Sequence, residues 1–136
     1  MPSFVLAWAV EELAHLRALN RGGRLLMVEH PTRGWELPGG GVEHGEDPEA
    51  AIHRELLEET GRRGKVVAWH RHYYPDGWVA AMVLDPGMDA VEDPMVKGSA
   101  WWTEAPPMRA WDPMELSDLG DWIETLQGQS AHPSGP

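Results

Sequence analysis

Apolar stretches alternate with polar segments rich in glycine and proline, and they predict elements in the order β, β, α, β, β, β, α. Residues 24–28 (RLLMV) follow a turn signal at 20–23 and are expected to form a buried strand. Residues 13–19 are ambiguous, because their spacing suits a helix but a hairpin partner of strand 24–28 would occupy the same place. Residues 30–41, with two prolines and four glycines, are predicted to form a loop.

The clearest helix signals lie around residues 48–60. Asp47 suits the N-cap, and Pro48 suits the first turn, where its missing N–H costs no hydrogen bond. Gly61 is the residue type that most often follows a helix C-terminus. This segment is therefore predicted to be the best-defined helix of the chain.

The second half of the chain predicts a hairpin, a strand and another helix. Residues 65–74 and 78–84 flank Pro75-Asp76-Gly77, which predicts a tight hairpin turn. A polar loop (85–98), a short strand (99–103) and an amphipathic helix (114–126) follow. We therefore expect one domain over residues 1–127 and a disordered tail over 128–136.

Composition excludes several classes of protein. The 136 residues include no cysteine, which excludes disulfides, thiolate zinc sites and a cysteine nucleophile. A formal net charge of −11 argues against binding a nucleic-acid polymer, although a small anionic substrate remains compatible if metal cations mediate the contact. The chain has no basic start before its first apolar run and no run long enough to span a membrane. We expect a cytoplasmic protein without membrane contact.

Three acids in the predicted helix carry candidate chemistry. Glu55, Glu58 and Glu59 are spaced i, i+3, i+4, so they lie within an arc of about 100° on one side of the helix. Like charges at this spacing repel one another, but a divalent cation among the oxygens would make the cluster favourable. A solvated acidic face that serves only solubility is the alternative.

The surrounding residues resemble a known family motif. Gly40, Glu46, Arg54-Glu55-Leu56, Glu58-Glu59 and Gly61 match every fixed polar and glycine position of the Nudix box, G-x5-E-x7-R-E-U-x-E-E-x-G-U, where U is bulky and apolar. Arg62 departs from it, because the family usually has an apolar residue there. The resemblance implies an α/β fold of the Nudix type, an α/β/α sandwich with a mixed β-sheet between helices.

The resemblance also implies roles for individual residues. The metal ligands would be the carboxylates of Glu55, Glu58 and Glu59 and the carbonyl of Gly39, with Mg²⁺ as the cofactor and Mn²⁺ possible. Arg54 would orient the acids, and Gly40, Glu46 and Gly61 would brace the motif. Glu58 or Glu59 could also serve as the general base. In some family members the base lies on a later loop, where Glu92, Asp93 and Glu104 are candidates here.

The implied activity is metal-dependent hydrolysis of a nucleoside diphosphate linked to another moiety. The preferred interpretation is a MutT-like nucleoside triphosphate pyrophosphohydrolase, which converts a nucleoside triphosphate or an oxidised deoxynucleoside triphosphate to a monophosphate and pyrophosphate. The alternatives are hydrolysis of ADP-ribose, a nucleotide sugar or a dinucleoside polyphosphate, and an inactive nucleotide-binding sensor. The candidate residues for contacting this small-molecule nucleotide are His30, Arg33, Trp78, Trp102 and Trp111. The sequence does not distinguish a monomer from a homodimer.

Overall fold

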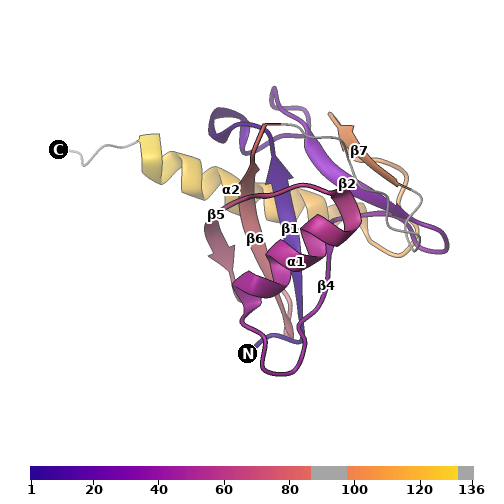
Figure 1. The fold of residues 1–136 in the computed structure, drawn as a ribbon. Helices are drawn as coiled ribbons and strands as arrows, with labels where there is room; N and C mark the ends of the chain where they lie inside the picture. Colours follow the sequence, from indigo (N-terminus) through magenta and orange to yellow (C-terminus); the bar gives the residue numbers. More distant parts are fainter. Residues whose placement is uncertain (87–97, 132–136) are drawn as a thin grey trace.

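A computed structural model describes residues 1–86 and 98–131 as two β-sheets, with helices on both faces of the larger sheet (Figure 1). In chain order the elements are β1 (Phe4–Val10), the 3-10 helix η1 (Leu13–His15), β2 (Leu25–His30), β3 (Gly34–Glu36), β4 (Gly39–Gly41), α1 (Pro48–Thr60), β5 (Gly64–His70), β6 (Gly77–Leu84), β7 (Gly98–Trp102) and α2 (Pro113–Ala131). Among these elements, no helix is both long and apolar enough to cross a membrane.

The larger sheet is mixed and has the strand order β4-β1-β6-β5. Strands β1 and β6 run parallel, whereas β4 and β5 pair antiparallel with their neighbours. The smaller sheet, β3-β2-β7, is antiparallel. Because α1 and α2 lie on opposite faces of the larger sheet, the predicted sandwich with a mixed sheet between helices is confirmed.

Strand β1 separates the core into two halves because successive side chains point to opposite faces of a sheet. Val5 and Ala7 belong to the cluster that includes Ile52 and Leu56 of α1. The second cluster, on the α2 side, includes Leu6, Trp8, Leu116, Leu119 and Ile123. Burial of both faces explains why β1 is apolar along almost its whole length.

Residues 13–19 form neither the helix nor the strand that their pattern allowed. Only Leu13–His15 are helical, and β2 pairs with β3 and β7 instead of with this segment. Ala18, Leu19 and Asn20 have positive φ angles of 49°, 40° and 65°, which neither a right-handed helix nor a strand accepts. The hairpin alternative for this segment is therefore wrong.

The segment predicted as a loop, 30–41, contains two three-residue strands, so that prediction was wrong in part. Strand β3 pairs with β2, whereas β4 pairs with β1 from the start of the chain. The glycines that suggested a loop instead permit the close pairing of Gly39–Gly41 with Phe4–Leu6. Such long-range pairing leaves no local signal in the sequence.

The predicted hairpin of β5 and β6 is confirmed, but its turn is longer than expected. Strand β5 ends at His70, and residues 71–76 form the connection. The Tyr73 hydroxyl donates to Asp118 and the Tyr74 hydroxyl donates to Glu115, each at 2.7 Å, so both tyrosines leave the strand to bind α2. Helix α2 runs to Ala131, four residues into the segment 128–136 that was expected to be disordered.

Candidate active site

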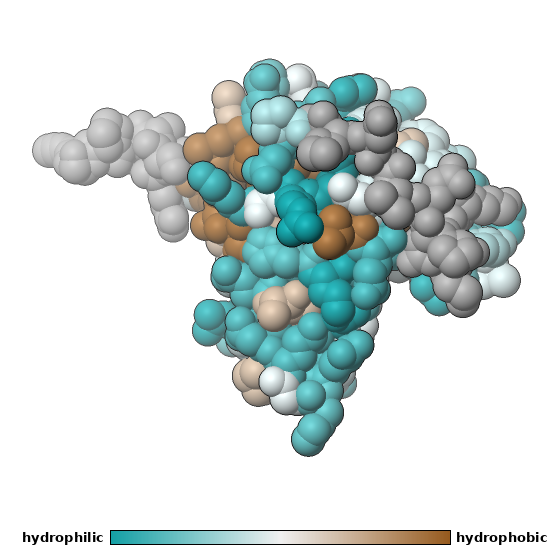
Figure 2. All heavy atoms as spheres, viewed as in Figure 1, coloured by the Kyte–Doolittle hydropathy of each residue, from teal (hydrophilic) through white to brown (hydrophobic). Residues whose placement is uncertain are grey.

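Helix α1 presents the acids on a rigid support. It begins after Asp47 and ends before Gly61, as predicted, and Gly61 adopts the left-handed conformation (φ 71°) while its N–H donates to the Leu57 carbonyl at 2.9 Å. Ala51, Ile52 and Leu56 are fully buried against the sheet. In the view of Figure 2 the surface over this helix is predominantly hydrophilic.

Arg54 connects the acidic residues to the preceding loop. Its Nε and Nη2 donate to the two carboxylate oxygens of Glu46 at 2.8 and 2.9 Å. Nη1 donates to Glu55 at 2.9 Å and lies 3.5 Å from Glu58, while Nη2 also donates to the Gly41 carbonyl at 3.0 Å. The hydrogen bonds that Arg54 donates to Glu46 and Glu55 raise the pKa of Arg54, which keeps this side chain charged. Arg54 therefore fixes the distance between the helix and β4.

Glu46 is the main partner of Arg54. The two hydrogen bonds from Arg54, together with one from the backbone N–H of Glu43 at 3.0 Å, lower the pKa of Glu46 to about 2. Glu46 thus holds the turn before α1 as well as the guanidinium. This placement matches a bracing role.

We expect this pair to make stability depend on pH. Because folding lowers the pKa of Glu46 from 4.5 to about 2, its contribution is complete above the higher value and is lost as pH falls towards the lower one. The difference in free energy of unfolding between the wild type and Glu46→Gln should shrink when urea denaturation is measured from about pH 6 down to about pH 3. The control Glu43→Gln removes a carboxylate that is 70% exposed and 3.9 Å from Arg54, and should give little difference at any pH. A Glu46→Gln difference that stays constant across this range would contradict the assignment.

Glu55 lies under β4. Its side chain is only 16% exposed, and this burial raises its pKa while the hydrogen bond from Arg54 opposes the shift. A Cβ at Gly40 would lie 2.6 Å from the Glu55 carboxylate, so a side chain at this position would displace the acid. Gly40 therefore forms a cradle in which the carboxylate lies directly against backbone.

Glu58 and Glu59 lie further along the same side of the helix. The Glu58 side chain is 54% exposed, with Arg54 as its partner. Glu59 Oε1 accepts the backbone N–H of Gly39 at 2.7 Å, which ties the helix to β4 a second time. Gly39 has a φ of 153°, and a Cβ there would lie 2.1 Å from the Val5 carbonyl oxygen. A residue with a side chain cannot occupy position 39 without separating β4 from β1.

The oxygen atoms of the three glutamates on α1 are suitable ligands for a hard divalent cation. Glu55, Glu58 and Glu59 offer carboxylate oxygens, which Mg²⁺ and Mn²⁺ prefer, and the Gly40 cradle brings backbone close to the most buried of them. Within residues 1–86 and 98–131, however, no three acidic or histidine side chains already converge as a metal site. Arg54 and the Gly39 N–H engage the carboxylates instead, so a bound cation would replace some of these contacts.

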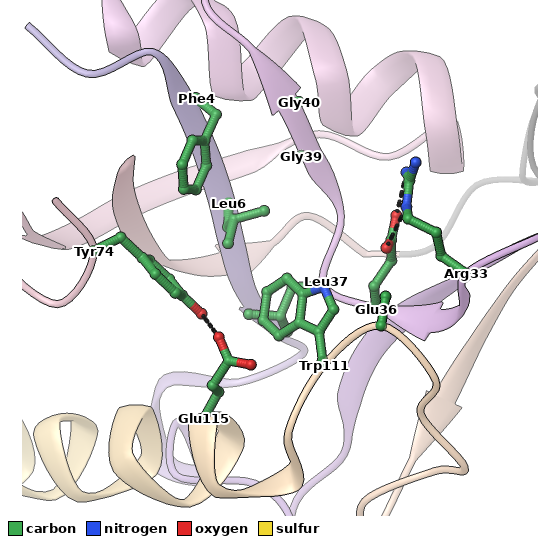
Figure 3. A pocket seen from close by; sticks show the side chains of 11 residues that line it. Phe4, Leu6, Arg33, Glu36, Leu37, Gly39, Gly40, Tyr74, Trp111 and Glu115 are labelled. Atoms are coloured by element: carbon green, nitrogen blue, oxygen red, sulfur yellow. Dashed lines mark hydrogen bonds and ion pairs between the residues drawn. The ribbon is translucent and has the colours of Figure 1, made fainter. Parts of the chain in front are cut away.

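A pocket of about 340 Å³ adjoins this motif (Figure 3). Its lining consists of Phe4, Leu6, Arg33, Glu36, Leu37, Gly39, Gly40, Tyr74, Ala110, Trp111 and Glu115. Gly39 and Gly40 thus belong both to the pocket wall and to the contacts of Glu59 and Glu55. Strand β4 therefore forms the boundary between this pocket and the carboxylates of α1.

Two predicted substrate residues, Arg33 and Trp111, line this pocket. Arg33 donates to both Glu36 oxygens at 3.0 and 2.8 Å, and the Glu36 side chain is only 11% exposed. The hydrogen bond to Glu36, aided by the charges of Glu36 and Glu59, raises the pKa of Arg33. Arg33 is thus a fixed positive charge at the end of the pocket nearest the acids.

The other predicted candidates lie elsewhere. His30 lines a separate pocket of about 170 Å³ with Trp35 and Arg109. Trp78 packs on the α1 face of the sheet, and Trp102 packs edge-on against Trp35 at 5.0 Å. Of the candidate bases on a later loop, Glu104 is exposed just after β7, and Glu92 and Asp93 lie outside the described residues.

Seven of the eleven residues that line the pocket were not among the predicted site residues, and Phe4, Tyr74 and Glu115 are three of them. One local signal was available for Glu115, because Asp112 and Glu115 have the spacing of a helix capping box. Phe4 and Tyr74 reach the pocket only through the pairing of distant strands, which no local pattern reveals.

Arg62, which departs from the motif, has a structural role. Its guanidinium lies 5.6 Å from the ring centroid of Trp101, and the guanidinium of Arg24 lies 5.5 Å from the same ring. A cation over an aromatic face is attracted by the ring quadrupole, so Arg62 packs where the family usually has an apolar side chain. The departure leaves the end of α1 intact.

The family model described as NUDIX domain matches residues 13–123. A 52-residue segment is 48% identical to a Bacillus subtilis (strain 168) protein provisionally named 8-oxo-dGTP diphosphatase YtkD, covering 38% of this chain and 33% of that protein. A 51-residue segment is 43% identical to the RNA pyrophosphohydrolase of Sphingopyxis alaskensis, covering 35% and 32% respectively. These matches span about a third of the curated relatives' length.

Solved structures support the same fold. The crystal structure of a UDP-X diphosphatase superposes with a TM-score of 0.67 at 20% identity, covering 93% of this chain and 64% of that one. A C. elegans Ap4A hydrolase gives a TM-score of 0.62 at 17% identity, covering 94% and 98%. The match of the family model over most of the chain, together with the glutamates and glycines in place on α1 and β4, shows that this chain belongs to the Nudix hydrolase family.

Proposed function

We propose that this protein hydrolyses nucleoside triphosphates to a monophosphate and pyrophosphate with a divalent cation, Mg²⁺ or Mn²⁺. The strongest support for this proposal is that the same residues of β4 line the pocket and contact the glutamates of α1. Gly39 and Gly40 line the pocket and also contact Glu59 and Glu55, so a nucleotide held in the pocket would place its phosphates against the carboxylates.

Charge explains why a cation is needed. A polyphosphate and a cluster of glutamates repel each other, and Arg54 alone does not offset both. Glu55, Glu58 and Glu59 would hold the cation, which when bound polarises a phosphoryl oxygen and makes an attacking water more acidic. Arg54, fixed by Glu46, would keep Glu55 in position for this task.

Side chains of this protein would bind the phosphates and accept the proton of the attacking water. Arg33, paired with the buried Glu36, would receive the phosphate chain at the rim of the pocket. Glu58 is the most exposed acid of the three, so it would accept the proton of the attacking water more readily than Glu59, which already binds the Gly39 N–H. The water's oxygen then bonds to phosphorus as the bond to the pyrophosphate leaving group breaks.

The size of the pocket bears on the alternative substrates. A volume of about 340 Å³ lies at the lower end of the range of roughly 300–1,000 Å³ typical of small-molecule sites. One nucleoside fits such a space, whereas the second half of a dinucleoside polyphosphate or of ADP-ribose would lie outside it. The three intact acids argue against an inactive sensor.

The test is a substrate panel with Mg²⁺. Nucleoside triphosphates, ADP-ribose, a nucleotide sugar, a dinucleoside polyphosphate and a 5′-triphosphorylated RNA are compared by kcat/KM, and the released pyrophosphate and phosphate are measured separately. We expect the highest kcat/KM for a nucleoside triphosphate, with pyrophosphate as the product. A higher value for any other compound, or nucleotide binding without turnover, would contradict the proposal.

A further inference from the structure

Strand β5 is one edge of the larger sheet. The strand order places β6 on one side of β5 and no described strand on the other. An edge strand presents a row of unpaired N–H and C=O groups, with which another chain can pair. Strand β5 has seven residues, whereas β4 at the opposite edge has three. Of the two edges of this sheet, β5 therefore offers the longer surface for a further strand.

Apolar side chains lie at this edge of the sheet. Val67, the central residue of β5, is 43% exposed. Val83 of β6 and Leu126 of α2 pack against the core on the α2 side, and both remain partly exposed. In Figure 1 the C-terminal end of α2 extends past β5, and Figure 2 shows hydrophobic surface where this helix leaves the body of the protein. A strand added beside β5 would therefore have a helix over one of its faces.

The charged side chains around this edge are separated by sign. Residues 61–75, which include β5, contain no acidic residue and four arginine or lysine residues, namely Arg62, Arg63, Lys65 and Arg71. Helix α2 contains no arginine or lysine and four acidic residues, namely Glu115, Asp118, Asp121 and Glu124. One chain therefore carries a basic strand and an acidic helix, which are complementary surfaces.

Three of these charges are available to a second molecule. The side chains of Arg63, Lys65 and Asp121 are exposed and form no ion pair within the part of the chain that the structure describes. Lys65 lies opposite Val83 in the pairing of β5 with β6, and cross-strand neighbours point to the same face of a sheet. Because Val83 packs on the α2 side, Lys65 points to the face on which the acidic helix lies.

Two features of β5 restrict which strand can pair with it. Lys65 lies on the edge strand, and a β-bulge lies between Val66 and Ala68. Both features oppose indiscriminate pairing, so a partner strand has to bring acidic side chains with it. A second copy of this chain does so. When two β5 strands pair antiparallel about a twofold axis perpendicular to the sheet, both α2 helices lie on the same face, and each extends over the β5 of the other copy.

We propose that β5 is the interface of a symmetric homodimer, in which the β5 strands of two copies pair antiparallel and join the two larger sheets into one. The backbone groups of the edge supply hydrogen bonds, and contacts between the acidic α2 of one copy and the basic β5 of the other select the partner. The interface lies at the edge opposite β4. Gly39, Gly40 and the glutamates of α1 that contact them stay uncovered, so formation of the dimer is independent of the proposed reaction.

The first test is sedimentation equilibrium of the full chain over a range of concentrations. We expect a dimer of twice the 15.2 kDa chain mass, with a dissociation constant below about 10 μM. Val67→Asp should raise this constant at least about tenfold, because the two copies of position 67 face each other in the symmetric pairing and like charges opposed across strands repel. A wild type that sediments as a monomer at about 100 μM would overturn the proposal.

Met114→Asp is the control for this substitution. Met114 is also an exposed apolar residue, at 61%, but it lies in the first turn of α2, at the end of the helix away from β5. The dissociation constant of this variant should stay within about twofold of the wild type. Equal weakening by the two substitutions would contradict the location of the interface.

Exchange of charges tests whether α2 of one copy contacts β5 of the other. Lys65→Glu and Asp121→Lys should each raise the dissociation constant about three- to tenfold, because each substitution brings like charges together across the interface. The double variant restores opposite charges and should dimerise at least about threefold more tightly than either single variant. Unchanged constants in the single variants, or a double variant that dimerises no more tightly than they do, would overturn the proposed contact.

Discussion

Replacement of Glu58 by glutamine is expected to lower kcat by roughly 100- to 1,000-fold, because loss of a charged metal ligand removes several kcal/mol of transition-state stabilisation. The fold should be unaffected. The Glu58 side chain is 54% exposed and its described partner is Arg54 at 3.5 Å, so the free energy of unfolding should change by less than about 0.5 kcal/mol. Steady-state kinetics with Mg²⁺ and urea denaturation measure the two quantities.

Glu49→Gln is the control for this experiment. Glu49 lies on the same helix and is 59% exposed, but it is in the first turn, and its partner is His53 at 4.0 Å. The substitution removes one negative charge but changes none of the proposed metal ligands, so kcat should stay within about twofold of the wild type. Near-normal activity in Glu58→Gln would refute the assignment of Glu58 to the cation.

Replacement of Gly39 by alanine is expected to destabilise the protein by roughly 2–4 kcal/mol, the combined cost of a strained backbone and an overpacked contact. The new Cβ would lie 2.1 Å from the Val5 carbonyl oxygen and 2.8 Å from the Leu6 Cα, and neither backbone atom can move without breaking the pairing of β4 with β1. Chemical denaturation of the purified variant measures the loss.

Gly41→Ala provides a matched comparison in the same strand. A Cβ at Gly41 meets only the Ser3 carbonyl oxygen, at 3.9 Å, which is an ordinary contact, and its φ is not in the positive range. The free energy of unfolding should therefore change by less than about 0.5 kcal/mol. Equal destabilisation of the two variants would contradict the close pairing described for β4.

Local signals in the sequence were sufficient for α1 and for the acids on it. The helix begins after Asp47, with Pro48 at its first position, and ends before Gly61, although the Asp47 side chain makes no capping hydrogen bond. These boundaries depend on backbone chemistry within a few residues. The side of the helix that carries Glu55 is likewise set by the helical repeat. Both features therefore appear in the structure where the pattern placed them.

The pocket depends on contacts between distant residues, and only part of it was predicted. Arg33 and Trp111 were found from residue type and position beside a strand or loop, but Phe4, Tyr74 and Glu115 were missed. Tyr74 was assigned to a strand, whereas its bond to Glu115 takes it out of the sheet. A hydrogen bond between residues 41 positions apart leaves no periodic trace in a single sequence.

In the proposed reaction, the glutamates of α1 and the neighbouring pocket together cleave a nucleoside triphosphate between its α and β phosphates. The most direct test is ³¹P NMR of one nucleoside triphosphate incubated with the protein, once with Mg²⁺ and once with excess chelator. We expect equal amounts of monophosphate and pyrophosphate with Mg²⁺, and no cleavage with chelator. Formation of diphosphate and inorganic phosphate, or cleavage that continues with chelator, would contradict it.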